Sequence, residues 1–310
     1  MNSPIFSIII PTYNRENSIA NCLESVLNQT FTSFEILIID NKSTDDTILE
    51  ITKISDERIK LFVNDRNYER CYSRNKGIDR AIGHYITFLD SDDVFLPNHL
   101  QNWYDFLAKN KQENTFFISD KEICIKNEKR IIPPFIDYSD KKNLLKSPVI
   151  PGQTCIPTKI AKKFKFETDY LIFEDTALWL QLAMNYEIST APFSSYSYSV
   201  NEENSVNVKK NNFGERRVTS LQNFIHQNPD IVVFFGLRQF KIELSKSFFA
   251  IAKFHMANQN RKKAIFFLLK SMTRSPTHFQ FKHKSLLILS LILNKEIKEY
   301  GFNIHYYLKD

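Results

Sequence analysis

The sequence predicts an α/β fold, with a mainly parallel central sheet and helices on both faces, followed by an all-helical region. Short apolar runs rich in β-branched residues alternate four times with helical patterns before residue 93, and such alternation calls for a parallel sheet. From about residue 213 the apolar spacing becomes helical throughout. We therefore expect two domains, 1–210 and 211–310.

The elements of the first domain follow from local patterns. Buried strands are predicted over residues 5–10, 34–39, 59–63 and 85–88, because each run is apolar and rich in β-branched or aromatic residues. The segments between them carry helical spacing, the last from about Ser73. Further strands are expected over 115–119 and 149–156, on either side of a charged, proline-interrupted excursion.

The fourth strand ends in three carboxylates within four positions, Asp90, Asp92 and Asp93. Carboxylates this close repel one another, so the cluster is either a solvated turn or a site for a hard divalent cation. Ligands of open α/β sheets bind beyond the carboxyl ends of the strands. The polar segments after the first, second and fourth strands all fall there, which favours a site.

No glycine-rich phosphate loop follows the first strand. A nucleotide diphosphate bound to this sheet would therefore need another group to neutralise its charge. A metal ion held by the carboxylates after the fourth strand would do so.

Four segments, taken in order, resemble the successive motifs of family 2 glycosyltransferases, which have the GT-A fold. They are Pro-Thr-Tyr-Asn at 11–14, Ile-Asp-Asn-Lys-Ser-Thr-Asp at 39–45, Ser-Arg-Asn-Lys-Gly-Ile at 73–78 and Asp-Ser-Asp-Asp at 90–93. The resemblance covers about residues 5–205. It has one departure: the second motif usually reads Asp-Asp-Gly-Ser, and Asn41 and Lys42 stand here in place of its second acid and its glycine.

The resemblance implies a metal-dependent, inverting enzyme that moves a sugar from a nucleotide-sugar donor, UDP-linked, to a hydroxyl group. The acceptor implied is a glycan or lipid-linked glycan in the synthesis of a bacterial surface polysaccharide, and the cofactor is Mn²⁺ or Mg²⁺. The implied metal ligands are Asp92, Asp90 and Asp93. The implied donor-binding residues are Pro11, Thr12, Tyr13, Asn14, Asp40, Arg74, Asp90 and Ser91.

The acidic pair Glu174-Asp175 stands at the start of a helical pattern. The pair could simply cap the helix, since its unpaired N–H groups and dipole stabilise anions there. A carboxylate kept ionised in this way could also serve as a general base. In the family this looks like the motif whose aspartate takes the acceptor proton, which implies Asp175 as the base and Glu174 as its support.

The charge of the chain is divided unevenly. Residues 1–208 hold 23 Lys or Arg and 29 Asp or Glu, whereas residues 209–310 hold 18 and 6, a net charge of +12. Basic residues interleaved with apolar ones around 262–284 predict contact with an anionic membrane, and the alternatives are a helical appendage on the catalytic domain or a homodimer contact. Nucleic acid is not expected, because no recognised binding module accompanies the charge.

Two rival functions stay open on the sequence alone. A nucleotidyltransferase on a similar sheet usually has a glycine-rich first loop, which is absent, and a catalytically silent glycan- or membrane-binding module would not need the acidic residues. The four widely spaced cysteines are typical of reduced thiols. We expect a cytoplasmic protein, peripheral on the inner face of the cell membrane if its basic region binds lipid.

Overall fold

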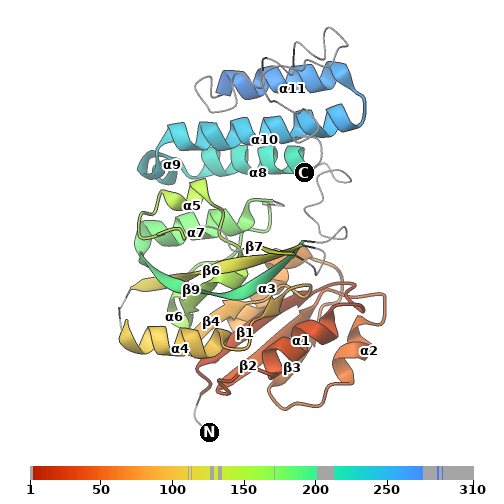
Figure 1. The fold of residues 1–310 in the computed structure, drawn as a ribbon, viewed down its shortest axis with the longest axis vertical. Helices are drawn as coiled ribbons and strands as arrows, with labels where there is room; N and C mark the ends of the chain where they lie inside the picture. The colour runs from red at the N-terminus through yellow and green to blue at the C-terminus, as the bar shows by residue number, and fades with distance from the viewer. Residues whose placement is uncertain are drawn as a thin grey trace. The chain divides into compact units, whose positions relative to one another are not determined.

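The computed structural model describes residues 3–110, 112, 114–125, 129–131, 135–170, 172–200 and 213–274, with residues 285 and 288 in isolation. The chain divides into two units, which are coloured along the sequence in Figure 1. The first, the catalytic unit, comprises residues 1–169 and 174–201. The second, the helical unit, comprises 170–173 and 202–310, so it includes four residues that lie inside the first unit in sequence.

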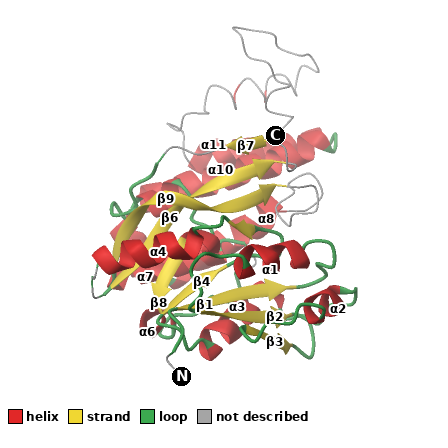
Figure 2. Ribbon diagram, turned by 60° about the horizontal axis from the view of Figure 1, so that its bottom comes forward, coloured by secondary structure: helices red, strands yellow, loops and turns green. Residues whose placement is uncertain are grey.

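Within its described residues, the catalytic unit is built on a nine-stranded sheet in the order β3-β2-β1-β4-β8-β6-β9-β5, with β7 paired to β6 (Figure 2). β1 pairs in parallel with β2 and β4, and β2 pairs in parallel with β3, so the predicted α/β fold is confirmed. The strands are β1 (Phe6–Thr12), β2 (Phe34–Asp40), β3 (Ile59–Val63), β4 (Tyr85–Phe88), β5 (Val94–Phe95), β6 (Thr115–Ile125), β7 (Lys129–Ile131), β8 (Thr154–Pro157) and β9 (Glu187–Val200).

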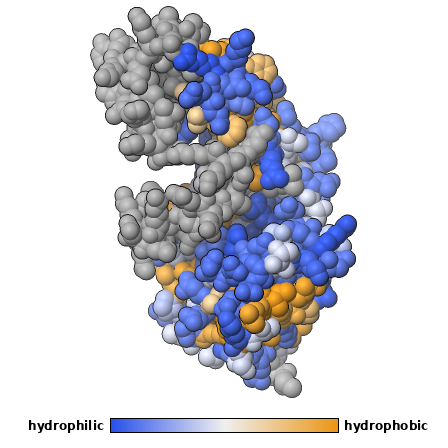
Figure 3. Space-filling model, turned by 90° about the vertical axis from the view of Figure 1, so that its right-hand side faces the viewer, coloured by the Kyte–Doolittle hydropathy of each residue, from blue (hydrophilic) through white to orange (hydrophobic). Residues whose placement is uncertain are grey.

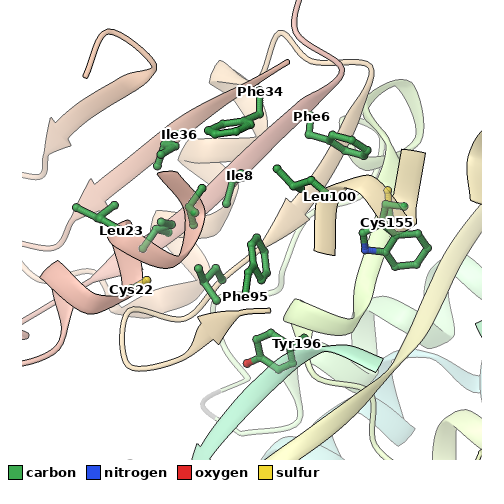
Figure 4. Packing of buried hydrophobic residues seen from close by; sticks show 14 of the residues in the cluster. Phe6, Ile8, Cys22, Leu23, Phe34, Ile36, Phe95, Leu100, Cys155 and Tyr196 are labelled. Atoms are coloured by element: carbon green, nitrogen blue, oxygen red, sulfur yellow. The ribbon is translucent and has the colours of Figure 1, made fainter. Parts of the chain in front are cut away.

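Helices cover both faces of this sheet, because alternate residues of β1 and β2 are apolar on both sides. Ile8 packs with Leu23 of one helix and Leu100 of another in a single buried cluster (Figure 4). The helices of this unit are α1 (Ile19–Leu27), α2 (Thr47–Thr52), α3 (Glu69–Arg80), α4 (His99–Lys109), α5 (Asn143–Lys146), η1 (Pro151–Gln153), α6 (Thr158–Ala161) and α7 (Glu174–Asn185).

α3 lies close against the other face of β1 because residue 77 is glycine. A Cβ atom built on Gly77 would lie 2.5 Å from Cγ2 of Ile9, well inside van der Waals contact. The close approach brings the first two turns of α3, with Arg70 and Arg74, toward the carboxyl ends of the central strands. The close packing of α3 on β1 therefore explains why the third motif has a glycine at this position.

β6 is longer than the sequence predicted. The expected strand over 115–119 continues to Ile125, through residues interpreted as the start of a charged excursion. Pairing with β9 supports the extra length, and the register of that pairing shifts at Asp120 and again before Glu122. Such irregularities bend a strand and re-aim its side chains, and they are frequent beside active sites.

Among its described residues the helical unit contains four helices: three follow the predicted spacing, the short second one was not predicted, and the further helix expected over 285–293 lies mostly outside them. α8 (Phe213–Gln227), α9 (Pro229–Phe235), α10 (Leu237–Ala257) and α11 (Arg261–Arg274) make up the unit. Fully buried Phe224 of α8 stacks on Phe240 of α10. The hydroxyl of Ser245 in α10 donates to the carbonyl of Ser271 in α11 at 2.8 Å.

Across the part of the chain that the structure describes, none of the helices has the length and apolar character needed to cross a membrane.

Candidate active site

The polar segments predicted to form a site meet at one edge of the sheet. Thr12, the last residue of β1, lies opposite Asp40, the last residue of β2. β4 pairs with β1 on its other side and leads into the acidic turn at 90–93. Three loops from neighbouring parallel strands therefore converge, as expected of a ligand site in an open α/β sheet.

The loops after β1 and β2 are joined by hydrogen bonds. The backbone N–H of Asn14 donates to Oγ of Ser43 at 3.0 Å, and Oδ1 of Asn14 accepts the N–H of Thr44 at 2.9 Å. Asp40 is fully buried and accepts hydrogen bonds from the N–H and hydroxyl of Ser43. Thr12 is buried too, and among the described residues its hydroxyl has no partner, so it is available to a ligand.

The departure from the second motif keeps the conformation that its glycine would supply. Lys42 has φ +67°, in the left-handed region that glycine occupies without cost. Asn41 is buried, and its side-chain oxygen accepts from Nδ2 of Asn64 and the backbone N–H of Tyr68, both at 3.0 Å. Hydrogen bonds to neighbouring loops therefore hold a backbone shape that the lysine side chain would not favour.

The acidic turn places its carboxylates in different surroundings. Asp93 is buried and accepts a short hydrogen bond from the hydroxyl of Tyr196 in β9. The side chain of Asp92 is 21% exposed and lies 3.6 Å from the guanidinium of Arg15. Burial and the charge of Asp90 raise the pKa of Asp92, with partial compensation by Arg15. Arg15 therefore balances the negative charge of Asp92 only in part.

Arg74 joins the acidic turn to the acidic pair. Its guanidinium is 1% exposed and donates to Oδ1 of Asp90 at 2.8 Å and to Oδ1 of Asp175 at 2.9 Å. Arg70, one turn earlier in α3, pairs with Oε1 of Glu174 at 2.5 Å. Two arginines of one helix thus hold three carboxylates that come from two distant parts of the sequence.

The two members of the acidic pair differ in access. The side chain of Glu174 is 4% exposed, whereas that of Asp175 is 23% exposed. Burial and the charge of Glu174 raise the pKa of Asp175 to about 7, although Arg74 and Arg70 oppose the shift. Burial also disfavours ionised Asp90, but Arg74 outweighs it, and the pKa of Asp90 lies below its usual value. Asp175 is therefore the accessible carboxyl that can exchange a proton near neutral pH.

The residues present fit a divalent cation that also binds substrate phosphate. Asp90 and Asp92 are partly exposed and lie two residues apart, so both can supply oxygen ligands. The ion pair of Asp92 with Arg15 is long, at 3.6 Å. Within the described residues no cluster of three acidic, histidine or cysteine side chains could hold a metal alone. One or two carboxylates together with substrate phosphate oxygens is a common way to bind Mg²⁺.

Several residues of the site were not singled out from the sequence. Arg70 precedes Arg74 by four residues, so the helical period could have identified it. Tyr196 reaches Asp93 from a strand 103 residues away, and no local pattern indicates that contact. Lys121, at the irregularity of β6, donates to Oε1 of Gln153, and burial lowers its pKa to about 8, although Asp120 and Asp93 oppose the shift.

Two solved structures have a similar fold. Staphylococcus aureus TarS (residues 1–349, in complex with UDP-GlcNAc) superposes with a TM-score of 0.60 at 17% identity, covering 96% of this chain and 94% of that one. The mannosyltransferase PcManGT of Pyrobaculum calidifontis, in complex with GDP-Man and Mn²⁺, gives 0.59 at 16% identity, covering 95% and 89%. The fold is therefore that of the GT-A glycosyltransferases.

The sequence comparison identifies the family. Residues 7–162 match the model described as glycosyl transferase family 2. The chain is 30% identical over 258 residues to the Escherichia coli protein WfgD, covering 80% of this chain and 97% of that protein, which is named UDP-Glc:α-D-GlcNAc-diphosphoundecaprenol β-1,3-glucosyltransferase. The chain belongs to glycosyl transferase family 2. This confirms the resemblance and removes the nucleotidyltransferase alternative.

Proposed function

We propose that the chain transfers a sugar, with inversion, from a UDP-sugar to a hydroxyl group of a lipid-diphosphate-linked glycan in bacterial polysaccharide synthesis. The donor and acceptor in the name of the E. coli relative support this assignment. The observation that carries it is the position of Asp175, a partly exposed carboxyl held by Arg74 beside Asp90 at the carboxyl ends of the strands. One base and one diphosphate-binding turn are the parts that a single displacement needs.

Asp175 is the proposed base because its accessibility and its pKa of about 7 suit proton transfer at neutral pH. It takes the proton of the acceptor hydroxyl while that oxygen forms a bond to the anomeric carbon. The bond from that carbon to the diphosphate oxygen breaks, and UDP leaves. Attack from the face opposite the leaving group inverts the configuration, and Arg74 and Glu174 keep Asp175 in position.

Donor binding is assigned to the loops after β1, β2 and β4. Tyr13 is 40% exposed, and the hydroxyl of Thr12 has no partner among the residues that the structure describes. These two residues are assigned to the nucleoside, together with Pro11, Asn14, Asp40 and Ser91. Mn²⁺ or Mg²⁺, when bound, would neutralise charge on the diphosphate. Asp92 and Asp90 are its proposed ligands, whereas Asp93, already bonded to Tyr196, is assigned to hold the turn.

UDP with Mn²⁺ should stabilise the wild-type chain and not the Asp92→Asn variant. A ligand at about 100 times its Kd adds about 2.7 kcal/mol to the free energy of unfolding. We expect thermal unfolding to show this increase only with both UDP and Mn²⁺. Asp79→Asn, which changes an exposed carboxylate of α3, is the matched control and should keep the increase.

Equal shifts with and without Mn²⁺ would contradict the metal assignment. Release of UDP from UDP-glucose in the presence of a short-chain alkyl GlcNAc-diphosphate tests transfer itself. If UDP binds but is not released from the donor with this or any glycan acceptor, the chain is a silent binding module instead.

We also propose that α11 contacts an anionic membrane surface, where a lipid-linked acceptor would lie. Residues 213–274 hold eleven Lys or Arg and three Asp or Glu. On α11, Phe266 and Leu269 are 51% and 50% exposed, and the adjacent Lys262 and Lys263 are exposed as well. Figure 3 shows one face of the molecule, on which apolar areas lie among hydrophilic residues.

Reversing two charges on α11 should weaken binding to anionic vesicles. Each lysine near such a surface contributes about 1 kcal/mol, so Lys262→Glu with Lys263→Glu should reduce co-sedimentation with phosphatidylglycerol vesicles by about tenfold or more. Lys162→Glu with Lys163→Glu, an exposed lysine pair of the catalytic unit, is the control. No binding, together with a doubled mass in solution that the α11 changes abolish, would support a homodimer contact instead.

A further inference from the structure

Four residues of the helical unit lead directly into the acidic pair. The segment 170–173 belongs to the helical unit, and the next residue, Glu174, begins α7 of the catalytic unit. We propose that the helical unit, through this segment, positions the base Asp175, with Phe224 of α8 as the main positioning residue. The inference rests on the proposed role of Asp175.

Tyr170 and Phe173, the two ends of this segment, are held by aromatic packing and a hydrogen bond within the helical unit. The ring of Phe173 lies 5.4 Å from the ring of Phe224, edge to face, and the ring of Tyr170 lies 6.0 Å from it. The hydroxyl of Tyr170 donates to Oε1 of Gln227 in α8 at 2.6 Å. The single ring of Phe224 in α8 therefore contacts both ends of the segment. This ring is completely buried.

Phe173 has a backbone conformation that its side chain does not favour. Its φ is +93°, a region that a bulky residue other than glycine rarely adopts. Such a conformation persists only where the surroundings hold it, and the contact with Phe224 supplies that constraint. Phe173 directly precedes the first turn of α7, so its φ sets the direction in which Glu174 and Asp175 leave the segment.

The ion pairs around Asp175 depend on that direction. Asp175 must lie within hydrogen-bond distance of Arg74, as it does at 2.9 Å, and must also face the acceptor hydroxyl. If Phe173 lost its partner ring, its φ could relax and the first turn of α7 would shift. Displacement of a reacting group by about 1 Å can cost on the order of 100-fold in rate.

The test compares two phenylalanine-to-alanine changes in the full-length chain. Phe224→Ala removes the ring beneath the segment, and Phe248→Ala removes a buried ring of α10 that packs on Phe267 of α11. Turnover is measured as UDP release from UDP-glucose with the alkyl GlcNAc-diphosphate. We expect Phe224→Ala to lower kcat by about 100-fold, with an unchanged KM for UDP-glucose, and Phe248→Ala to change kcat by less than about threefold.

The pH profile separates positioning from general loss of structure. An Asp175 that has moved away from Arg74 loses part of its opposing positive charge, so the acid limb of kcat/KM should shift to higher pH in Phe224→Ala and stay in place in Phe248→Ala. Equal kcat and equal acid limbs in the two variants would overturn the inference.

A milder variant keeps the inference testable if Phe224→Ala does not fold. Tyr170→Phe removes only the hydroxyl that donates to Gln227, and it should lower kcat by about three- to tenfold with donor binding intact. Wild-type kcat in Tyr170→Phe, with Phe224→Ala unfolded, would also overturn the inference. Failure of the proposed function looks different: without sugar transfer, neither the wild type nor any variant would release UDP, and if Asp175 were not the base, Asp175→Asn would retain wild-type turnover.

Discussion

Asp175→Asn is expected to lower kcat by about 1,000-fold while UDP binding with Mn²⁺ stays at the wild-type level. General-base catalysis contributes about 10²–10⁴-fold, and an amide of the same shape cannot accept the acceptor proton. The amide oxygen can still accept the hydrogen bond from Arg74, so the geometry of the cluster should persist. The measurement is UDP release under saturating donor, together with the UDP-induced thermal shift.

The wild-type pH profile gives an independent check on Asp175. The base acts when ionised, so kcat/KM should fall about tenfold per pH unit below the pKa of about 7 and level off above it. Because this pKa is raised in the folded state, the group's contribution to stability is present at low pH and is lost as the pH rises through about 7. Asp175→Asn should therefore be no less stable than the wild type at pH 8.

Wild-type turnover in Asp175→Asn would remove Asp175 as the base. Glu174→Gln is the companion variant, because its carboxylate is buried and pairs with Arg70. We expect it to reduce kcat less than Asp175→Asn does. The reverse order would assign the base to Glu174.

Arg74→Lys is expected to have the second-largest effect, with a decrease in kcat of about 100-fold. The planar guanidinium donates to Asp90 and Asp175 from two different nitrogens, whereas a lysine ammonium is a single point donor and cannot reproduce both contacts. The acid limb of the pH profile should also move upward, because an ammonium that pairs with Asp90 lies farther from Asp175 and lowers its pKa less than the guanidinium does. Steady-state kinetics over a range of pH measures both changes.

The cost of removing this charge entirely should appear as lost stability. Arg74→Gln leaves Asp90, Glu174 and Asp175 short of a buried cation, and breaking such a cluster typically costs about 3–5 kcal/mol. Arg70→Gln is the control, because Arg70 is 34% exposed and should cost less in urea unfolding. Equal destabilisation by the two changes would contradict the proposal that Arg74 is the main cation that stabilises these carboxylates.

The sheet and the strand-end loops could be predicted because their determinants are local. Apolar runs such as residues 5–10 form β1, and parallel pairing then places Thr12 beside Asp40. The acidic turn after β4 joins the same edge for the same reason. The helical pattern after residue 213 was equally local, and it gave α8, α10 and α11 nearly as they are.

The contacts that organise the site could not be predicted, because they join distant segments. Arg74 was expected near the nucleotide from its motif, but its pairing with Asp175, 101 residues away, depends on the placement of α7. The same is true of Tyr196 and Asp93. The continuation of β6 to Ile125 runs against its charged sequence, since pairing with β9 outweighs local propensity there.

The discontinuous helical unit bears on how such enzymes can exchange parts. Because Tyr170 and Phe173 pack on Phe224 of α8, a single crossover near residue 201 would join a new set of helices to a Tyr170 and Phe173 selected for another partner. A productive chimaera between relatives would need to carry this short segment together with the helices. Recombination at one point should therefore be a poor route to a new helical unit, and Tyr170 and Phe173 should change in step with the surface of α8.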